Sequence, residues 1–403
     1  MKKCNRTLHS PVAHPSLLTM NITIVGAIKE IGADEWNALA GKKNPFLRYE
    51  FLSALETHHC VGERYGWIPQ HITLRDDNHQ LIGAVPLYLK DNSYGEFVFD
   101  WSWADAYHRS GLEYYPKLVV AMPYTPATGP RLLIAKDRDY KNIASALIEA
   151  SIQHAKNLKV SSLHWLFTNE QDTQQLAEHG FMQRLGCQFH WTNQNYESFE
   201  QYLQTLTRGK RKNINRERRH VKDASVQLEI LDGREATEKH WHTFHRYYDS
   251  TFMKLGGYAT LSAEFFQEVA TTMPDSIVLV MAKHDNQYLA AALSFRGTDT
   301  LYGRHWGCEK EINSLHFEAC YYQGIEYCIK HGLQRFEPGA QGEHKIARGF
   351  LPTATYSCHW IAEPVFQNAI AEFLQRETRG MRQYIEQLSQ HSPFKAEPEE
   401  MAN

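Results

Sequence analysis

The sequence lacks any run of about 18 apolar residues, so we expect no membrane-spanning helix. It also lacks the glycine-rich nucleotide motifs: no G-x-G-x-x-G follows an expected strand, and no G-x-x-x-x-G-K-S/T occurs. A dinucleotide-binding fold and a P-loop therefore have no support. Its 7 cysteines are scattered and form no C-x-x-C pair, which is typical of reduced thiols rather than of a disulfide framework or a zinc cage.

An excess of positive charge is missing as well. The chain has 43 Lys and Arg against 46 Asp and Glu, a net charge of −3. This balance argues against a globally basic nucleic-acid-binding protein but leaves room for a local basic patch. With 403 residues, 42% of them hydrophobic, the chain is long enough for two to three domains of roughly 100–200 residues. Residues 1–20 have no continuous apolar stretch and predict a disordered tail, not a signal peptide. We expect a soluble, cytoplasmic protein.

Two common catalytic signatures are absent too. The sequence has 22 histidines, but neither His58-His59 nor the group His240, His242 and His245 forms an H-E-x-x-H pattern, so we expect no metal site. No G-x-S-x-G occurs, so a serine nucleophile has no support.

What the sequence does contain is one ordered pattern that occurs twice. Each copy has a hairpin, a helix, a short strand and a closing strand with a His-Trp pair. A meander, a helix and a strand that returns to the sheet predict an α+β (mixed α/β) fold, not a doubly wound sheet. We predict a first domain over 21–193, a second over 194–390 and a disordered tail over 391–403. The elements are expected at 68–88, 140–158, 162–167 and 187–192, and again at 277–295, 314–331, 333–338 and 356–362.

The densest polar cluster covers residues 337–350, directly after an expected buried strand. Its three glycines allow sharp turns and close approach of the backbone to a ligand. Around them the segment offers a carboxylate, an amide, an imidazole, an ammonium and a guanidinium, which favours a functional loop over the alternative, a charged surface loop. The candidate residues are Glu337, Gln341, His344, Lys345 and Arg348.

A second candidate is the strand around Arg304. Strand alternation predicts Tyr302, Arg304 and Trp306 on one face. An arginine between aromatic rings suits a planar or anionic ligand, and the alternative is an edge strand with ordinary aromatic packing.

A third candidate is the basic segment 208–222, which has eight Lys or Arg and one Glu. It could bind a polyphosphate or nucleic-acid backbone, or it could be a solvated helix without a ligand. Its candidate anion-binding residues are Lys210, Arg211, Lys212, Arg216, Arg218 and Arg219.

A fourth candidate is the aromatic run 97–107 together with the turn 123–131. Trp101, Asp105 and Arg131 could line a pocket for a cationic or amino-bearing substrate. For most of these aromatic residues we favour the alternative, a place in the core with the Trp N–H groups bonded to neighbouring Asp.

Two such copies joined by a basic segment resemble the tandem GNAT-like architecture of the FemA/FemB/FemX group. The similarity to FemAB-like "peptidoglycan biosynthesis/recognition" proteins covers about residues 33–362 and implies two tandem GNAT-like domains. It is carried by Gly339–Phe350, Asp100–Asp105, Thr128–Arg131, Gln188–Trp191 and Lys210–Ile214.

The resemblance implies an acyl- or aminoacyltransferase. Better-understood relatives take an aminoacyl group from aminoacyl-tRNA, whereas ordinary GNAT enzymes use acyl-CoA and bind its pyrophosphate at a glycine-rich turn. Here the connection 307–313 has one Gly, two carboxylates and one Lys, a poor site for a diphosphate. We therefore favour aminoacyl-tRNA over acyl-CoA as the co-substrate, with no tightly bound cofactor and a small-molecule amine as acceptor. The alternatives are an acyl-CoA-dependent N-acyltransferase and a non-catalytic ligand-recognition protein.

In the expected reaction an amine attacks an activated ester or thioester and forms an amide. His344 or Glu337 would accept the proton. Lys345 and Arg348 would stabilise the oxyanion or hold an anionic group, and Gln341 would position the carbonyl. The sequence leaves open whether one or both copies carry a working site.

Overall fold

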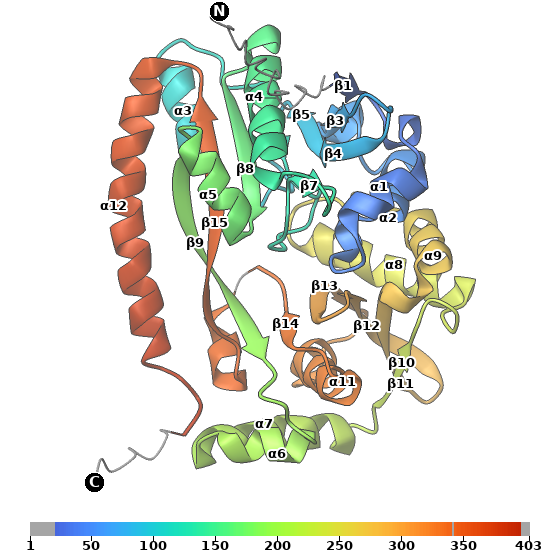
Figure 1. Ribbon diagram of the computed structural model, residues 1–403. Coiled ribbons are helices and arrows are strands. Elements are labelled where there is room, and N and C mark those ends of the chain that lie inside the picture. Colours follow the sequence, from blue (N-terminus) through green and yellow to red (C-terminus); the bar gives the residue numbers. More distant parts are fainter. Residues whose placement is uncertain (1–20, 341, 396–403) are drawn as a thin grey trace, which may run out of the picture.

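The computed structural model describes residues 21–340 and 342–395 (Figure 1). The first half of the chain contains β1 (Asn21–Val25), α1 (Ala33–Ala40), α2 (Tyr49–Thr57), β2 (Ile68–Pro69), β3 (His71–Arg75), β4 (Leu81–Val85), β5 (Leu87–Lys90), α3 (Trp101–Arg109), β6 (Lys117–Val120), β7 (Leu133–Ile134), α4 (Tyr140–Leu158), β8 (Ser162–Thr168), α5 (Glu170–Glu178) and β9 (Met182–Thr192). The second half contains α6 (Phe199–Thr205), α7 (Arg208–Asp223), β10 (Gln227–Leu231), α8 (Glu238–Lys254), α9 (Ala263–Thr272), β11 (Ile277–His284), β12 (Gln287–Arg296), β13 (Thr300–Cys308), α10 (Leu315–Phe317), α11 (Gln323–His331), β14 (Arg335–Glu337), β15 (Leu351–Ile361) and α12 (Pro364–Ser389).

Both copies of the expected pattern are present, but their hairpins differ. In the second half β11 and β12 form a regular antiparallel pair, and Asp285 and Asn286 in the turn both have positive φ, as a tight hairpin turn requires. In the first half Pro86 interrupts the returning strand, because proline has no N–H for the ladder. As a result β4 pairs with β3 in a four-stranded sheet of order β1-β3-β4-β7, whereas β5 enters the larger sheet.

The larger sheet has 11 strands in the order β10-β11-β12-β13-β14-β9-β15-β8-β6-β5-β2. The two halves exchange their closing strands within it: β9 of the first half pairs with β14, and β15 of the second half pairs with β8. The exchanged strands also pair with each other, from Leu351↔His190 to His359↔Met182 (Figure 1). One continuous sheet therefore joins the two halves.

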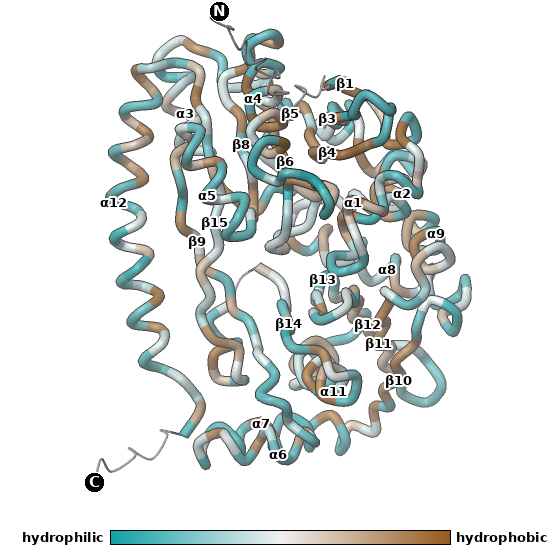
Figure 2. Tube along the Cα trace, in the orientation of Figure 1, coloured by the Kyte–Doolittle hydropathy of each residue, from teal (hydrophilic) through white to brown (hydrophobic). Residues whose placement is uncertain are grey.

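Helices cover both sheets and complete the core. In α4, Ile143, Leu147 and Ile148 are fully or almost fully buried, as expected where one apolar face of a helix packs against β3, β4 and β8. α8 packs against β12 and β13, and α12 packs against β9 and β15. Figure 2 shows hydrophobic residues along β4 and β11, whereas the outer helix α12 alternates between hydrophobic and hydrophilic residues.

Each half contains one pair of parallel strands that separate after three paired residues. β6 and β8 pair from Leu118↔Leu163 to Val120↔Trp165, and β13 and β14 pair from Thr300↔Arg335 to Tyr302↔Glu337. β13 continues to Cys308, while β14 ends at Glu337. The gap that opens between two such strands is where a sheet offers a crevice for a ligand.

Two expectations need correction. The helix expected at 314–331 is interrupted by a π-helical turn, Glu318–Tyr322, between α10 and α11. Residues 391–395, which we expected in a disordered tail, pack against α6. The backbone N–H of Lys395 donates to the backbone oxygen of Thr205 at 2.9 Å, and Phe394 forms an isolated β-bridge with Leu206. Residues 1–20 and 396–403 lie outside the described part. Within that part, no helix is long and apolar enough to cross a membrane.

Candidate functional site

Glu337 ends β14 at the start of the gap between β13 and β14. Its side chain is buried, and its Oε2 atom has no hydrogen-bond partner among the described residues. Burial raises the pKa of Glu337 to about 7, against the opposing charge of Arg335, whose Nη1 lies 3.8 Å from Oε1. A buried carboxyl group with one free oxygen and a pKa near neutrality is typical of a general base.

The first half supplies part of the surroundings of Glu337. A pocket of about 180 Å³ lies where the two halves meet, with Thr128, Tyr302 and Arg335 in its wall. The hydroxyl of Thr128 is buried without a hydrogen-bond partner among the described residues. Arg304 donates to the backbone oxygen of Tyr124, so a residue of β13 is bonded directly to the first half.

The prediction that Tyr302, Arg304 and Trp306 share one face is wrong for Trp306, whereas Tyr302 and Arg304 both lie near the ring of Phe46. The pairing of β12 with β13 shifts by one residue between Leu293 and Ser294, and this β-bulge reverses the alternation. The Tyr302 ring packs against Phe46, whereas Trp306 lies on the other side of the sheet beside His316.

Lys345 is the buried cation of the loop that follows β14. Its Nζ donates to the backbone oxygen of Gly339 at 2.9 Å, and burial lowers the pKa of Lys345 to about 8. The pKa of His190 is lowered to about 3, first by burial and then by the positive charges of Arg335 and Lys345. This imidazole is therefore neutral. His190 is bonded to Gln188, whose amide donates to Pro126 O of the first half at 2.8 Å.

His344 and Gln341 belong to the same loop. His344 is exposed, and its Nε2 lies 2.9 Å from the hydroxyl of Tyr321. The pKa of His344 is lowered, first by the partial burial of its ring and then by the positive charges of Arg348 and Lys345. Gln341 lies outside the described residues.

Arg348 is engaged by the protein itself. Its Nη2 and Nε lie 2.7 and 3.3 Å from the two carboxylate oxygens of Glu217 in α7, and its Nη1 donates to His344 O at 2.7 Å. Its guanidinium also lies 3.5 Å from the centre of the Phe317 ring. Arg348 therefore ties the loop to α7, in place of the ligand contact that we expected.

Removal of the ion pair between Arg348 and Glu217 is expected to lower the stability of the protein. Glu217→Ala leaves the guanidinium of Arg348 buried without its carboxylate, and we expect the free energy of unfolding to fall by about 3–5 kcal/mol in urea denaturation. Arg219→Ala, an exposed change on the same helix, is the control and should stay within about 0.5 kcal/mol of the wild type. Equal stability of the two variants would show that the pair does not hold the loop.

The basic segment forms α7, whose buried residues Ile214 and Val221 face the protein. Arg218 differs from the expectation, because its guanidinium is paired with Glu318 at 3.1 Å and Glu326 at 2.9 Å. The other candidates have no ion-pair partner among the described residues. They are Lys210, Arg211, Lys212, Arg216 and Arg219.

Arg131 also differs from the expectation of a substrate-binding residue. Four of its five N–H groups donate to backbone oxygens, those of Ala127, Gly129, Pro130 and Leu166. Gly129 itself accepts from Asn169 and donates to Phe167, directly beside β8. In the first half this turn therefore fills the gap between β6 and β8.

Trp101 and Asp105 lie on the outer face of α3. Trp101 is 54% exposed, and the exposed carboxylate of Asp105 lies 3.1 Å from Arg109. Neither residue is in the wall of the pocket that Thr128, Tyr302 and Arg335 line. The favoured interpretation, a place in the core, describes Trp103 and Tyr107 instead, which are buried. The expected bond from a Trp N–H to a neighbouring Asp is wrong for Trp103, whose Nε1 has no hydrogen-bond partner among the described residues.

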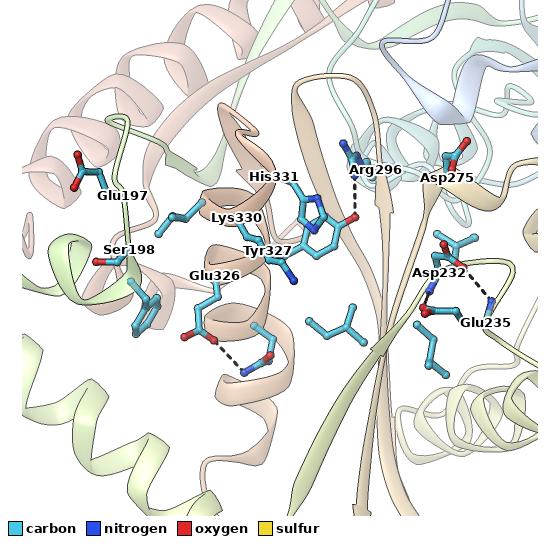
Figure 3. Close-up of a pocket in the computed structure, with 16 residues that line it drawn as sticks. Glu197, Ser198, Asp232, Glu235, Asp275, Arg296, Glu326, Tyr327, Lys330 and His331 are labelled. Atoms are coloured by element: carbon cyan, nitrogen blue, oxygen red, sulfur yellow. Dashed lines mark hydrogen bonds between the residues drawn. The ribbon is translucent and has the colours of Figure 1, made fainter.

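A large pocket of about 790 Å³ lies between α11 and the start of β11 (Figure 3). None of the residues expected at a functional site lines it. Its carboxylates are largely paired, Asp275 with Arg234 and Glu326 with Arg218, and Tyr327 accepts a hydrogen bond from Arg296. Size therefore does not mark the site in this protein.

Sequence reasoning did not assign roles to Thr128, Gln188, His190 and Glu217. Three of them lie in segments quoted for the family resemblance. Glu217 could have been noticed because it is the only carboxylate in the basic segment, among eight Lys and Arg residues. Such a carboxylate can form an ion pair with an arginine elsewhere in the chain.

Two separated parallel strand pairs in one shared sheet define a tandem GNAT-like protein. Solved structures with similar folds include FemX, with a TM-score of 0.51, 12% identity and coverage of 85% of this chain and 98% of that one. L-PGS from Bacillus licheniformis is similar too, with a TM-score of 0.51, 9% identity and coverage of 85% and 97%. The chain belongs to the FemAB-like peptidoglycan biosynthesis/recognition family, whose model matches residues 27–396. No curated protein matches the sequence.

Proposed function

We propose that this protein transfers an aminoacyl group from aminoacyl-tRNA to the amine of a small molecule and so forms an amide. The observation that carries the proposal is that the segment from Glu337 to Arg348 holds two buried titratable groups, Glu337 with a pKa of about 7 at the end of β14 and Lys345 with a pKa of about 8, whose Nζ donates to Gly339 O. FemAB-like family membership supports the same class of reaction.

In the proposed step the amine nitrogen attacks the ester carbonyl carbon, and Glu337 takes the proton that the nitrogen loses. The ammonium of Lys345 stabilises the negative charge on the carbonyl oxygen. When the carbon–oxygen bond to the ribose breaks, Lys345 gives its proton to the departing hydroxyl. We prefer Glu337 to His344 as the base because His344 is already bonded to Tyr321.

The distribution of charge favours aminoacyl-tRNA as the donor. The connection after β13 has little to hold a diphosphate, whereas α7 presents several unpaired cations at the surface. Lys and Arg on one exposed helix are what a nucleic-acid backbone contacts. The bond between Arg348 and Glu217 places this helix next to the loop that holds Lys345.

The test is transfer of label from a pool of radiolabelled aminoacyl-tRNAs, and from a matched pool of acyl-CoAs, to small-molecule amines of a cell extract. Transfer from tRNA supports the proposal. Transfer from acyl-CoA alone would replace the donor, and no transfer from either pool would favour the non-catalytic alternative.

A charge-reversal variant tests the role of α7 in the same assay. Replacing Lys212, Arg216 and Arg219 by Glu should raise the KM for aminoacyl-tRNA at least about tenfold and flatten its salt dependence, because phosphate contacts are lost. The control reverses three exposed lysines of the first half, Lys136, Lys156 and Lys159. Equal effects in the two variants would remove α7 from the binding surface.

The two pKa values predict a narrow bell-shaped pH profile. Glu337 must be ionised to accept a proton, so kcat/KM rises as the pH passes about 7. Lys345 must be protonated, so kcat/KM falls as the pH passes about 8. The measurement is kcat/KM from pH 5 to 10 with one donor and one amine. A flat profile over pH 6–9 would contradict both roles.

A further inference from the structure

A cluster of exposed aromatic rings lies on the first residue of α3 and on the segment before it. Tyr94, Phe99 and Trp101 are 66%, 50% and 54% exposed. The ring of Trp101 lies 6.2 Å from that of Tyr94 and 5.6 Å from that of Phe99. Several large aromatic side chains grouped on a surface are typical of a recognition site, because each could be buried by a partner.

Phe99, one of these rings, lines a pocket of about 250 Å³ between the exchanged strands and α12. Its walls come from the segment before α3, from the exchanged strands β9 and β15, and from α12. Gly186 in β9 leaves room beside Thr355 of β15, since a Cβ at Gly186 would lie 2.8 Å from the Thr355 hydroxyl. The apolar part of the wall includes Phe97, Phe99, Phe167, Leu185, Tyr356 and Met381.

The charged groups in this wall are already paired. Nε and Nη2 of Arg184 lie 2.8 and 2.7 Å from the two carboxylate oxygens of Glu377. Nη1 of Arg184 donates to the backbone oxygen of Phe99 at 2.7 Å, which also holds the aromatic segment in place. The pocket therefore offers a ligand apolar surface and no unpaired charge from Arg184 or Glu377.

The pocket adjoins the candidate site. Ala340, in the loop after Glu337, and Gln188, whose amide donates to Pro126 O, are both in its wall. Phe97 connects the two: it lines the pocket, and its ring lies 5.9 Å from the guanidinium of Arg304. Phe97 also has φ of +60°, a backbone conformation that is rare for an aromatic residue and that clusters at functional sites.

We propose that this pocket binds an apolar, ring-sized group of the substrate and so positions the substrate beside Glu337. The size is suitable, because a dry cavity of about 150 Å³ holds one benzene ring and this pocket is larger. The part that concerns positioning rests on the proposed function; the binding of an apolar ring does not.

The test uses 5-fluoroindole as the probe, with ¹⁹F NMR and the full-length protein. Wild type should give a saturable shift of the fluorine signal at millimolar probe. Phe99→Ala, which removes a half-exposed ring, should weaken binding about fivefold or more. Met381→Trp, which fills the pocket from α12, should abolish it. Leu255→Ala, a change of an exposed apolar residue outside the pocket wall, is the control and should bind as wild type does.

No saturable shift in wild type, or equal binding by wild type and both pocket variants, would overturn the proposal. Because the readout is binding, it is independent of turnover. Binding of the probe by a protein that transfers nothing from either donor pool would leave the pocket in place and remove only the proposed reaction.

Discussion

Glu337→Gln is expected to lower kcat/KM by about 10²–10⁴-fold, the usual contribution of a general base. Gln has nearly the same shape as Glu but cannot accept a proton from the attacking amine. The exposed change Glu372→Gln on α12 is the matched control and should leave kcat/KM unchanged. A Glu337→Gln variant that keeps its activity at pH 8 would show that another group takes the proton.

The same variant should be more stable than wild type at pH 8. Folding raises the pKa of Glu337 from 4.5 to about 7, so the folded protein binds this proton more tightly than the unfolded chain does. The destabilisation that the buried, ionised carboxylate causes reaches its full size above about pH 7 and is absent below about pH 4.5. Urea denaturation should therefore show Glu337→Gln to be stabilised at pH 8, with the difference shrinking as the pH falls. Opposite changes in activity and stability would distinguish a functional carboxylate from a structural one.

Lys345→Met should lower kcat by about 10²–10³-fold, the usual cost of removing one donor to a developing oxyanion. Met keeps the buried volume and apolar stem but supplies neither charge nor proton. The alkaline limb of the pH profile should disappear at the same time, a change that a general loss of structure would not produce. Lys136→Met, at an exposed position of the first half, is the control. An unchanged alkaline limb in Lys345→Met would assign that limb to another group.

Much of the fold could be predicted from the sequence because it depends on local patterns. The turn at Asp285-Asn286, the helix over residues 140–158 and the strands that end near the His-Trp pairs all follow from spacing and turn chemistry. The strand exchange does not, because the pairing of β15 with β8 is set by contacts between residues far apart in the chain. The β-bulge next to Arg304 is likewise invisible to a rule of alternation.

The sequence indicates the residue types of the candidate site better than it indicates the role of each residue. Arg131, Arg218 and Arg348 have the composition expected of ligand-binding arginines, yet each is bonded to oxygen atoms of this chain. A sequence does not show whether a guanidinium meets a ligand or a carbonyl group of its own fold. Glu337 and Lys345 flank a glycine-containing turn after a buried strand, which the sequence shows, but the burial that shifts their pKa values arises only in the folded protein.

The exchange of closing strands sets an order of events during synthesis on the ribosome. His164 in β8 contacts His359 in β15, and the two are 195 residues apart. At roughly 5–20 residues per second, β8 waits about 10–40 s for this partner. During that interval the nascent first half presents an unpaired sheet edge, the kind of surface that attracts wrong partners. This edge of β8 therefore stays unpaired until nearly all of the chain has been translated.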